Sequence, residues 1–143
     1  PTNDNVVATY YKEFDAPKNW SDRHAYLKIQ ARSAYYIWVN QEYVGYSEDS
    51  RTVSEFDITK HLHIGKTNSV IVRVVGASTG SLLEMYQDRS YMGIVGDVSV
   101  MLKPFANVQD FNVMADYNAQ SKDGAFKLTA NIMNPAKKGQ YHQ

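Results

Sequence analysis

The chain has 143 residues, of which 43% are hydrophobic and 13% aromatic, enough for a globular domain with a core and unlike a disordered segment. Fifteen basic residues balance fifteen acidic ones, so no net field favours nucleic acid or an anionic membrane as a partner. No apolar run approaches the roughly 18 residues of a membrane helix, and the polar start PTNDN is not typical of a signal peptide. The absence of cysteine excludes disulfides and thiolate metal sites and leaves the compartment open, with the cytoplasm slightly favoured.

Apolar and aromatic residues alternate, or run in short blocks bounded by turn formers, which predicts an all-β protein. Turn signals about ten residues apart favour a β-sandwich. The strand that contains Ile71 and Arg73 is expected in the middle of a sheet and buried on both sides near its ends. Strands are predicted at residues 6–14, 24–30, 34–40, 43–47, 69–75, 94–102, 108–117 and 125–133.

A domain boundary is expected at Lys103-Pro104, because proline cannot donate to a β-ladder. Two further strands follow, and the turn signal Asp123-Gly124 joins them into a hairpin. A lone hairpin is marginal in water. Either it packs on the first domain or the chain is part of a longer one, and we expect the second arrangement.

The segment from Tyr36 to Thr59 joins an aromatic strand pair to a long polar connection, YIWVNQEYVGYSEDSRTVSEFDIT, with a two-residue turn expected at Gln41-Glu42. This pattern resembles the N-terminal sugar-binding domain of glycoside hydrolase family 2, most closely that of the β-galactosidases. The family's opening pattern, P-T-x-N followed by Tyr, Phe and Trp, resembles PTNDNVVATYYKEFDAPKNW. Its G-I-x-x-D-V strand resembles the run from Gly93 to Val98.

The resemblance implies a galactose-binding-like jelly-roll sandwich at 1–104, followed at 105–143 by the first strands of a truncated immunoglobulin-like sandwich. It implies hydrolysis of terminal, lactose-like β-galactosides by a catalytic barrel that these residues do not include. The fragment then holds no catalytic residue, no metal site and no cofactor, and is inactive alone. The implied partners are β-galactoside sugars and the downstream barrel, and the full protein is expected to be a homo-oligomer.

One residue of the sugar site is implied by the opening motif. Asn5 matches the family asparagine that reaches the galactose. A neutral sugar presents hydroxyls that donate and accept, and a carboxamide offers two donors and an acceptor. A turn or terminal role for Asn5 is the plain structural alternative.

A second contribution is implied by the family's acidic segment, whose aspartate binds sodium and the sugar. The corresponding run, GASTGSLLEMYQDRSYMGI, places Gln87 at that position, and Asp88 replaces the aspartate only if the loop shifts by one residue. A carboxamide oxygen coordinates a hard cation without the charge of a carboxylate. Sodium and magnesium are therefore expectations for the full enzyme only, and the sodium site is weakened.

The remaining groups of acidic residues and histidines are expected to have structural roles and not to form functional sites. Glu84 and Asp88 lie on one loop and are not expected to be a glycosidase acid and nucleophile. The connection at 48–59 should be held by local side-chain bonds and by Arg51, with contact to a neighbouring domain as the alternative. His61 and His63 should face the same way without forming a metal site.

Among the aromatic residues, Trp38 is expected in the core, because it lies in mid-strand between apolar residues. Tyr86 and Tyr91 are the better candidates for ligand contact. Two alternatives to the enzyme fragment stay open: a non-catalytic carbohydrate-binding module, which would bind galactose or lactose alone, and a purely structural domain, in which replacing Asn5 and Gln87 would leave hydrolysis unchanged.

Overall fold

The computed structural model of the chain describes residues 6–50, 52–83 and 92–133. The chain divides into two compact units, Pro1–Leu102 and Lys103–Gln143. The division falls beside the Lys103-Pro104 boundary that the sequence predicts. The immunoglobulin-like identity of the second unit stays a prediction.

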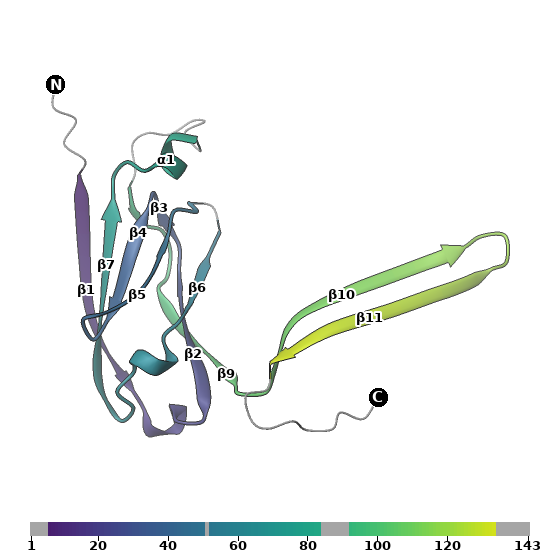
Figure 1. Ribbon diagram of the computed structural model, residues 1–143, viewed down its shortest axis with the longest axis horizontal. Helices are drawn as coiled ribbons and strands as arrows, with labels where there is room; N and C mark the ends of the chain where they lie inside the picture. Colours follow the sequence, from purple (N-terminus) through teal and green to yellow (C-terminus); the bar gives the residue numbers. More distant parts are fainter. Residues whose placement is uncertain (1–5, 51, 84–91, 134–143) are drawn as a thin grey trace. The chain divides into compact units, whose positions relative to one another are not determined.

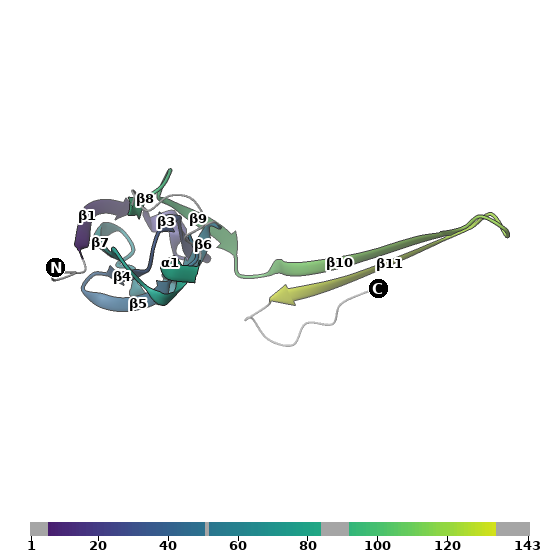
Figure 2. The ribbon, with the colours of Figure 1, turned by 90° about the horizontal axis from the view of Figure 1, so that it is seen from above.

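The first unit is a two-layer β-structure, as the alternating pattern predicts. One layer is a four-stranded sheet in the order β1 (Val7–Ala16), β7 (Lys66–Val75), β4 (Tyr35–Val39) and β5 (Glu42–Ser47). The other layer contains the three-stranded sheet β6 (Ser54–Asp57), β2 (Arg23–Ile29) and β9 (Ser99–Pro104), and the short pair β3 (Ala31–Arg32) and β8 (Gly93–Ile94). In Figure 2 the four strands of the first layer curve around one side, facing β3, β6, β8 and β9.

The helical elements of the described chain are short connections between strands. They are η1 (Lys18–Trp20), η2 (Thr59–His61) and α1 (Thr79–Leu83), and Figure 1 places each between strands of the first unit. The second unit is the hairpin of β10 (Asn107–Asn118) and β11 (Asp123–Met133). The prediction of an all-β fold is therefore confirmed.

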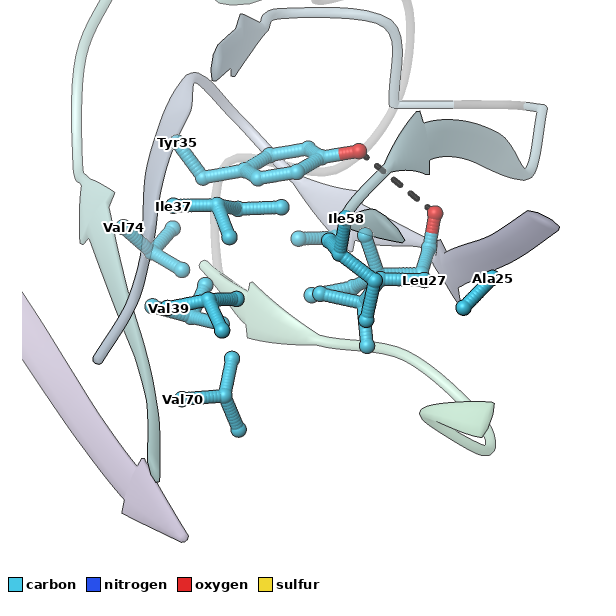
Figure 3. Close-up of a cluster of buried hydrophobic side chains, with 11 residues drawn as sticks. Ala25, Leu27, Tyr35, Ile37, Val39, Ile58, Val70 and Val74 are labelled. Atoms are coloured by element: carbon cyan, nitrogen blue, oxygen red, sulfur yellow. Dashed lines mark hydrogen bonds between the residues drawn. The ribbon is translucent and has the colours of Figure 1, made fainter. Parts of the chain in front are cut away.

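The core lies between the two layers and is built from alternate residues of their strands. Figure 3 shows Tyr35, Ile37 and Val39 of β4 directed toward Leu27 and Ile58. Each of these five side chains is at most 2% exposed, and burying one large apolar side chain is worth about 1.5–3 kcal/mol. The Tyr35 hydroxyl donates to the Ile29 carbonyl over 3.5 Å. The rest of the buried cluster is Ala25, Ile29, Ala31, Val70, Val72 and Val74.

Strand β7 lies inside its sheet, between β1 and β4, as the sequence predicts. Its burial is more one-sided than expected. Val70, Val72 and Val74 are buried, whereas on the outward side Thr67 and Arg73 are exposed and the residues between and after them are half-buried. The reason is that no described strand covers the outer face of this sheet, so only the inner set of the alternating side chains leaves water.

Three details of the strands and turns differ from the sequence prediction. The hairpin turn between β4 and β5 is Asn40-Gln41, one residue earlier than expected, and both residues have positive φ, 50° and 69°. The polar connection contains β6, which pairs with β2. The strand expected at 94–102 is two strands, β8 and β9, separated at Gly96, whose φ of 80° breaks the extended backbone.

A buried polar network holds the turn between β4 and β5. Asn68 is 1% exposed; its Oδ1 accepts from Asn40 Nδ2 and from the His63 backbone N–H, both at 2.7 Å. Its Nδ2 donates to the carbonyls of His63 and Lys66. Asn40 Nδ2 also donates to the His61 carbonyl over 2.8 Å. Because every buried polar atom of Asn68 has a partner, the network costs little to bury and fixes the loop before β7.

Candidate functional site

The sequence-predicted sugar-site residues Asn5, Gln87 and Asp88 lie outside the described residues. The same is true of Glu84, Tyr86 and Tyr91, and of Arg51 in the polar connection. The described chain does fix where these segments attach to the fold. All of the attachment points lie at the end of the first unit where β1 starts and β7 ends, which we call the site end (Figure 1).

The opening motif attaches at the site end because β1 runs antiparallel to β7. Val7 at the start of β1 pairs with Val75 at the end of β7. The Gly76 backbone N–H donates to the Val6 carbonyl over 2.7 Å, and the Val75 N–H donates to the Ala34 carbonyl over 2.8 Å. Residue 6, one position after Asn5, is therefore bonded directly to the residue that opens the 76–92 segment.

The far side of that segment returns to the same place through a second set of backbone bonds. Gly93 pairs with Arg32, and Ile94 pairs with Ala31. The Val95 N–H donates to the Gln30 carbonyl over 2.8 Å. The two motifs that sequence reasoning assigned to the sugar site, far apart along the chain, are thus attached to adjoining strands.

The polar connection also reaches the site end, through Glu48. Its Oε2 accepts from the Tyr46 hydroxyl over 3.0 Å and from the Gly80 backbone N–H of α1 over 3.2 Å. Partial burial, followed by the hydrogen bond to Glu48 and its negative charge, raises the pKa of Tyr46 to about 12. The carboxylate therefore links β5 to α1, a contact that sequence reasoning did not single out because the two positions are 32 residues apart.

Other carboxylates of the connection make local bonds, as the sequence predicts. Asp49 accepts from the Thr52 backbone N–H over 3.1 Å and from the Thr52 hydroxyl. Asp57 Oδ1 accepts from the backbone N–H and the hydroxyl of Thr59, at 2.9 and 2.5 Å. Glu55 forms an ion pair with Lys28 at 3.7 Å. The bonds of Asp49 and Asp57 shape the turns on either side of β6, and the Glu55 ion pair joins β6 to β2.

The two histidines do not face the same way, which corrects the expectation from the HLH pattern. His61 is 8% exposed, and its Nδ1 lies 2.7 Å from Glu42 Oε2. His63 is exposed. The pattern misleads because His61 ends the 3₁₀ turn η2, which breaks the alternation of a strand. Within residues 6–50, 52–83 and 92–133, no group of three or more metal-ligating side chains is close enough to hold a metal ion.

Trp38 is not in the core, contrary to the prediction. The residues on either side of it, Ile37 and Val39, are buried, so alternation directs the indole to the outer face of the sheet, where it is half-buried. There its ring lies 6.1 Å from that of Tyr36 and 5.9 Å from that of Tyr43. The size and aromatic character of Trp38 indicated burial, but its position in the alternation decided its direction.

A cavity of about 540 Å³ opens along the seam between β1 and β9. Its inner wall is apolar and reaches the core residues Leu27 and Val72, while Lys12 and Asp15 stand among its lining residues. Its volume is in the range of ligand sites, but such sites combine an apolar wall with several convergent polar groups. Tyr10, Tyr11, Trp20 and Ser99 add neutral polar groups to the lining, but the two motifs assigned to the sugar both attach at the site end, which is the better candidate.

The first unit is a β-sandwich in which the connections that carry both motifs attach at one end. Residues 1–104 match the family model described as glycosyl hydrolases family 2, sugar binding domain. The chain therefore belongs to glycosyl hydrolase family 2, with the sugar-binding domain as its first unit.

Curated relatives and solved structures agree with this assignment. The chain is 38% identical over 135 residues to a β-galactosidase of Priestia megaterium, covering 94% of this chain and 13% of the relative. It is 37% identical over 139 residues to a β-galactosidase of Halalkalibacterium halodurans, covering 96% of this chain and 14% of the relative. The chain thus spans about one seventh of the length of these relatives.

The solved structures that resemble the chain include β-glucuronidases. One from an uncultured Clostridium species has a TM-score of 0.74 at 18% identity, covering 94% of this chain and 25% of that one. Another, from Ruminococcus gnavus, has a TM-score of 0.73 at 19% identity, covering 91% of this chain and 24% of that one. At such low identity the likeness shows a shared fold and does not choose between the two sugars.

Among the described residues, no helix is both long and apolar enough to span a membrane.

Proposed function

We propose that this chain is the N-terminal portion of a β-galactosidase that hydrolyses terminal, lactose-like β-galactosides. The observation that supports it is the match to β-galactosidases at 37–38% identity over more than 90% of the chain, which accounts for only 13–14% of their length. In this proposal the catalytic acid and nucleophile belong to a barrel outside these 143 residues.

In this proposal the site end forms one wall of the sugar pocket. Asn5 and the 84–91 segment supply hydrogen bonds to sugar hydroxyls, with Gln87 or Asp88 in place of the family aspartate. Three features support it: residue 6 is bonded to Gly76, both ends of the 76–92 segment are anchored by β7 and β8, and Glu48 fixes α1. Such anchoring limits the entropy that a pocket wall loses when substrate binds.

The test uses the complete gene product that contains this chain and a chromogenic β-galactoside. Asn5→Ala removes up to three hydrogen-bonding positions from the sugar and should lower kcat/KM by about 10-fold or more, the effect of one lost bond of about 1.4 kcal/mol. Asn3→Ala, two residues away and not assigned to the sugar, is the matched control. Equal activity of Asn5→Ala and wild type would show that the site end does not touch the sugar.

The cation question has its own test in the same protein. Gln87→Asp restores the carboxylate that hard cations prefer. We expect this variant to gain a dependence of KM on sodium concentration relative to wild type, with potassium as the control salt. A wild-type enzyme that already responds to sodium as strongly as the variant would contradict the weakened sodium site, and Asp88→Asn would then test whether the loop has shifted by one residue.

We also propose that residues 105–143 begin a second, immunoglobulin-like sandwich. The apolar side chains of the hairpin share one face by register, since Val113 pairs with Leu128 and Ala115 with Phe126. No residue of β10 or β11 is buried. An apolar sheet face of this kind is stable only when a second layer covers it.

A further inference from the structure

The outer face of the four-stranded sheet carries a continuous group of aromatic side chains. It consists of Tyr36 and Trp38 on β4 and Tyr43 and Tyr46 on β5, and we call it the aromatic face. The ring centroids of Tyr46 and Tyr36 are 4.8 Å apart. Those of Tyr36 and Trp38 are 6.1 Å apart, and those of Trp38 and Tyr43 5.9 Å apart. The chain of rings therefore runs unbroken across both strands.

These rings stay in contact with solvent in the described chain. Tyr43 is 54% exposed, Tyr46 41% and Tyr36 37%. They share a face because Tyr36 pairs with Tyr46 and Trp38 with Tyr43 across the β4–β5 ladder. A monomeric protein rarely leaves several neighbouring aromatic side chains uncovered without a partner for them.

Arg73 of β7, the strand next to β4, places a charge at one side of the aromatic face. Its guanidinium carbon lies 5.6 Å from the centroid of the Trp38 ring, within the range of a cation–π contact. Tyrosine, tryptophan and arginine are the residues enriched where protein surfaces bind each other most tightly. The composition of the face is therefore that of a protein–protein contact, with a charge that an opposing carboxylate can meet.

The arrangement of the rings argues against a platform for a sugar polymer. Stacking on the flat faces of successive sugar rings requires nearly coplanar aromatic planes. Here the planes are tilted by 33° between Tyr36 and Trp38, by 48° between Tyr36 and Tyr46, and by 61° between Trp38 and Tyr43. Tilted rings give an irregular surface, and the side chains of another protein surface can pack between them.

The size of the face decides between the protein partners. The four aromatic side chains offer roughly 300–400 Å² of accessible surface, from about 200 Å² for each fully exposed ring. A stable dimer buries about 800 Å² on each partner. Contacts between domains of one chain are smaller, about 600–1,500 Å² in total, because a covalent link removes most of the entropy cost of association.

We propose that the aromatic face is the docking surface for the part of the same polypeptide that lies beyond these 143 residues. The partner surface is apolar, with a carboxylate opposite Arg73. The inference rests on the proposed function, in which the chain spans 13–14% of an enzyme like its curated relatives. It assigns to this sheet the task of holding the sugar-binding domain against the rest of the enzyme.

The test is hydroxyl-radical labelling of the complete gene product, compared with the 143-residue chain. Trp38 and Tyr43 should be labelled readily in the chain and several-fold more slowly in the complete protein, whereas labelling of Ile64, in the turn before β7, should not change. Tyr43→Lys in the complete protein should loosen the docked state by about 10-fold or more, the loss expected at a contact hot spot, and restore Trp38 labelling. Ile64→Lys is the matched control.

Each other result overturns the proposal. Equal labelling of Trp38 in the complete protein and in the 143-residue chain would show that the rest of the polypeptide does not cover the aromatic face. Protection that disappears on dilution identifies a second copy as the occupant. Binding of lactose or a soluble β-galactan to the 143-residue chain that Tyr43→Lys abolishes identifies a sugar platform.

Hydrolysis measured on the same complete protein separates this inference from the proposed function. Active enzyme with an unprotected Trp38 overturns the docking surface alone. Protected Trp38 in a protein that does not cleave β-galactosides overturns the proposed activity alone. A gene that ends near Gln143 overturns both.

Discussion

Strand β4 of the sandwich and strand β10 of the hairpin both carry apolar residues at every second position, yet these residues are buried only in β4. In β4, Tyr35, Ile37 and Val39 are buried. In β10, Phe111 and Val113 remain 64% and 47% exposed. Alternation is a property of the chain, whereas burial needs a second layer facing the strand. The sandwich has that layer within its own residues, and the hairpin does not.

The difference predicts where the free energy of folding resides. Apolar burial is the main favourable term, so the first unit should hold nearly all of the stability of this chain. Substitutions of one kind placed in both regions should therefore have very different effects. Four experiments test this contrast, beginning with the largest expected effect.

A leucine truncated in each region gives the sharpest contrast. Leu27→Ala removes a side chain that is 2% exposed, and should lower the free energy of unfolding by about 2–5 kcal/mol. Leu128→Ala removes one that is 57% exposed, and should change it by less than about 0.5 kcal/mol. Urea unfolding followed by tryptophan fluorescence measures both, and equal shifts of the midpoint would contradict the contrast.

The same leucine pair tests what covers the hairpin. In the complete gene product, a second sandwich that buries Leu128 should raise the cost of Leu128→Ala toward that of Leu27→Ala. If Leu128→Ala stays neutral there, the hairpin's apolar face has no covering layer and the immunoglobulin-like proposal is wrong.

A buried asparagine compared with an exposed one tests the polar network. Asn68→Ala leaves the His63 N–H and one N–H of the Asn40 amide without an acceptor in a buried site. We expect a loss of about 2–3 kcal/mol in urea unfolding. Asn131→Ala, on the exposed hairpin, is the control and should lie within about 0.5 kcal/mol of wild type. A neutral Asn68→Ala would mean that the network does not hold the turn.

The turns of the two hairpins, β4–β5 and β10–β11, each carry a non-glycine residue at positive φ and offer a stabilising test. Gln41 has a φ of 69° and Lys122 a φ of 64°. Gln41→Gly relieves about 1–2 kcal/mol of left-handed strain, partly offset by the entropy of glycine, so we expect a gain of about 0.5 kcal/mol for the sandwich. Lys122→Gly should leave its unfolding unchanged. An unstable Gln41→Gly would show that the glutamine side chain stabilises the turn.

The smallest effect is expected from the titration of Tyr46. Its pKa is raised from 10.0 to about 12, first by burial and then by Glu48. The folded state therefore holds this proton more tightly than the unfolded state. The resulting stability is present below pH 10 and is lost as the pH rises toward 12. Ultraviolet absorbance should show a late tyrosinate phase that disappears in Tyr46→Phe and moves to lower pH in Glu48→Gln.

Much of this architecture was predictable, because each strand needed only local alternation. The central place of β7 followed from its run of apolar residues, and β1, β2, β4 and β5 lie within a few residues of their predicted positions. The errors have a common physical cause: Trp38, η2 and β6 depend on what packs or pairs with them from elsewhere in the chain. Periodicity reports which residues share a face and leaves open which face is covered.

For the candidate site, sequence patterns and tertiary structure contribute different parts. The family motifs alone point to Asn5 and Gln87, since no property of an isolated asparagine or glutamine marks it as a sugar ligand. Composition and alternation by themselves determined an all-β chain with balanced charge, because these depend only on residue type and order. Only the tertiary structure decided that the segments carrying the two motifs attach at one end, through the bond of Gly76 to Val6 and the pairing of Gly93 with Arg32. It also decided that Trp38 faces outward, because contacts between residues distant in sequence depend on how the sheets assemble.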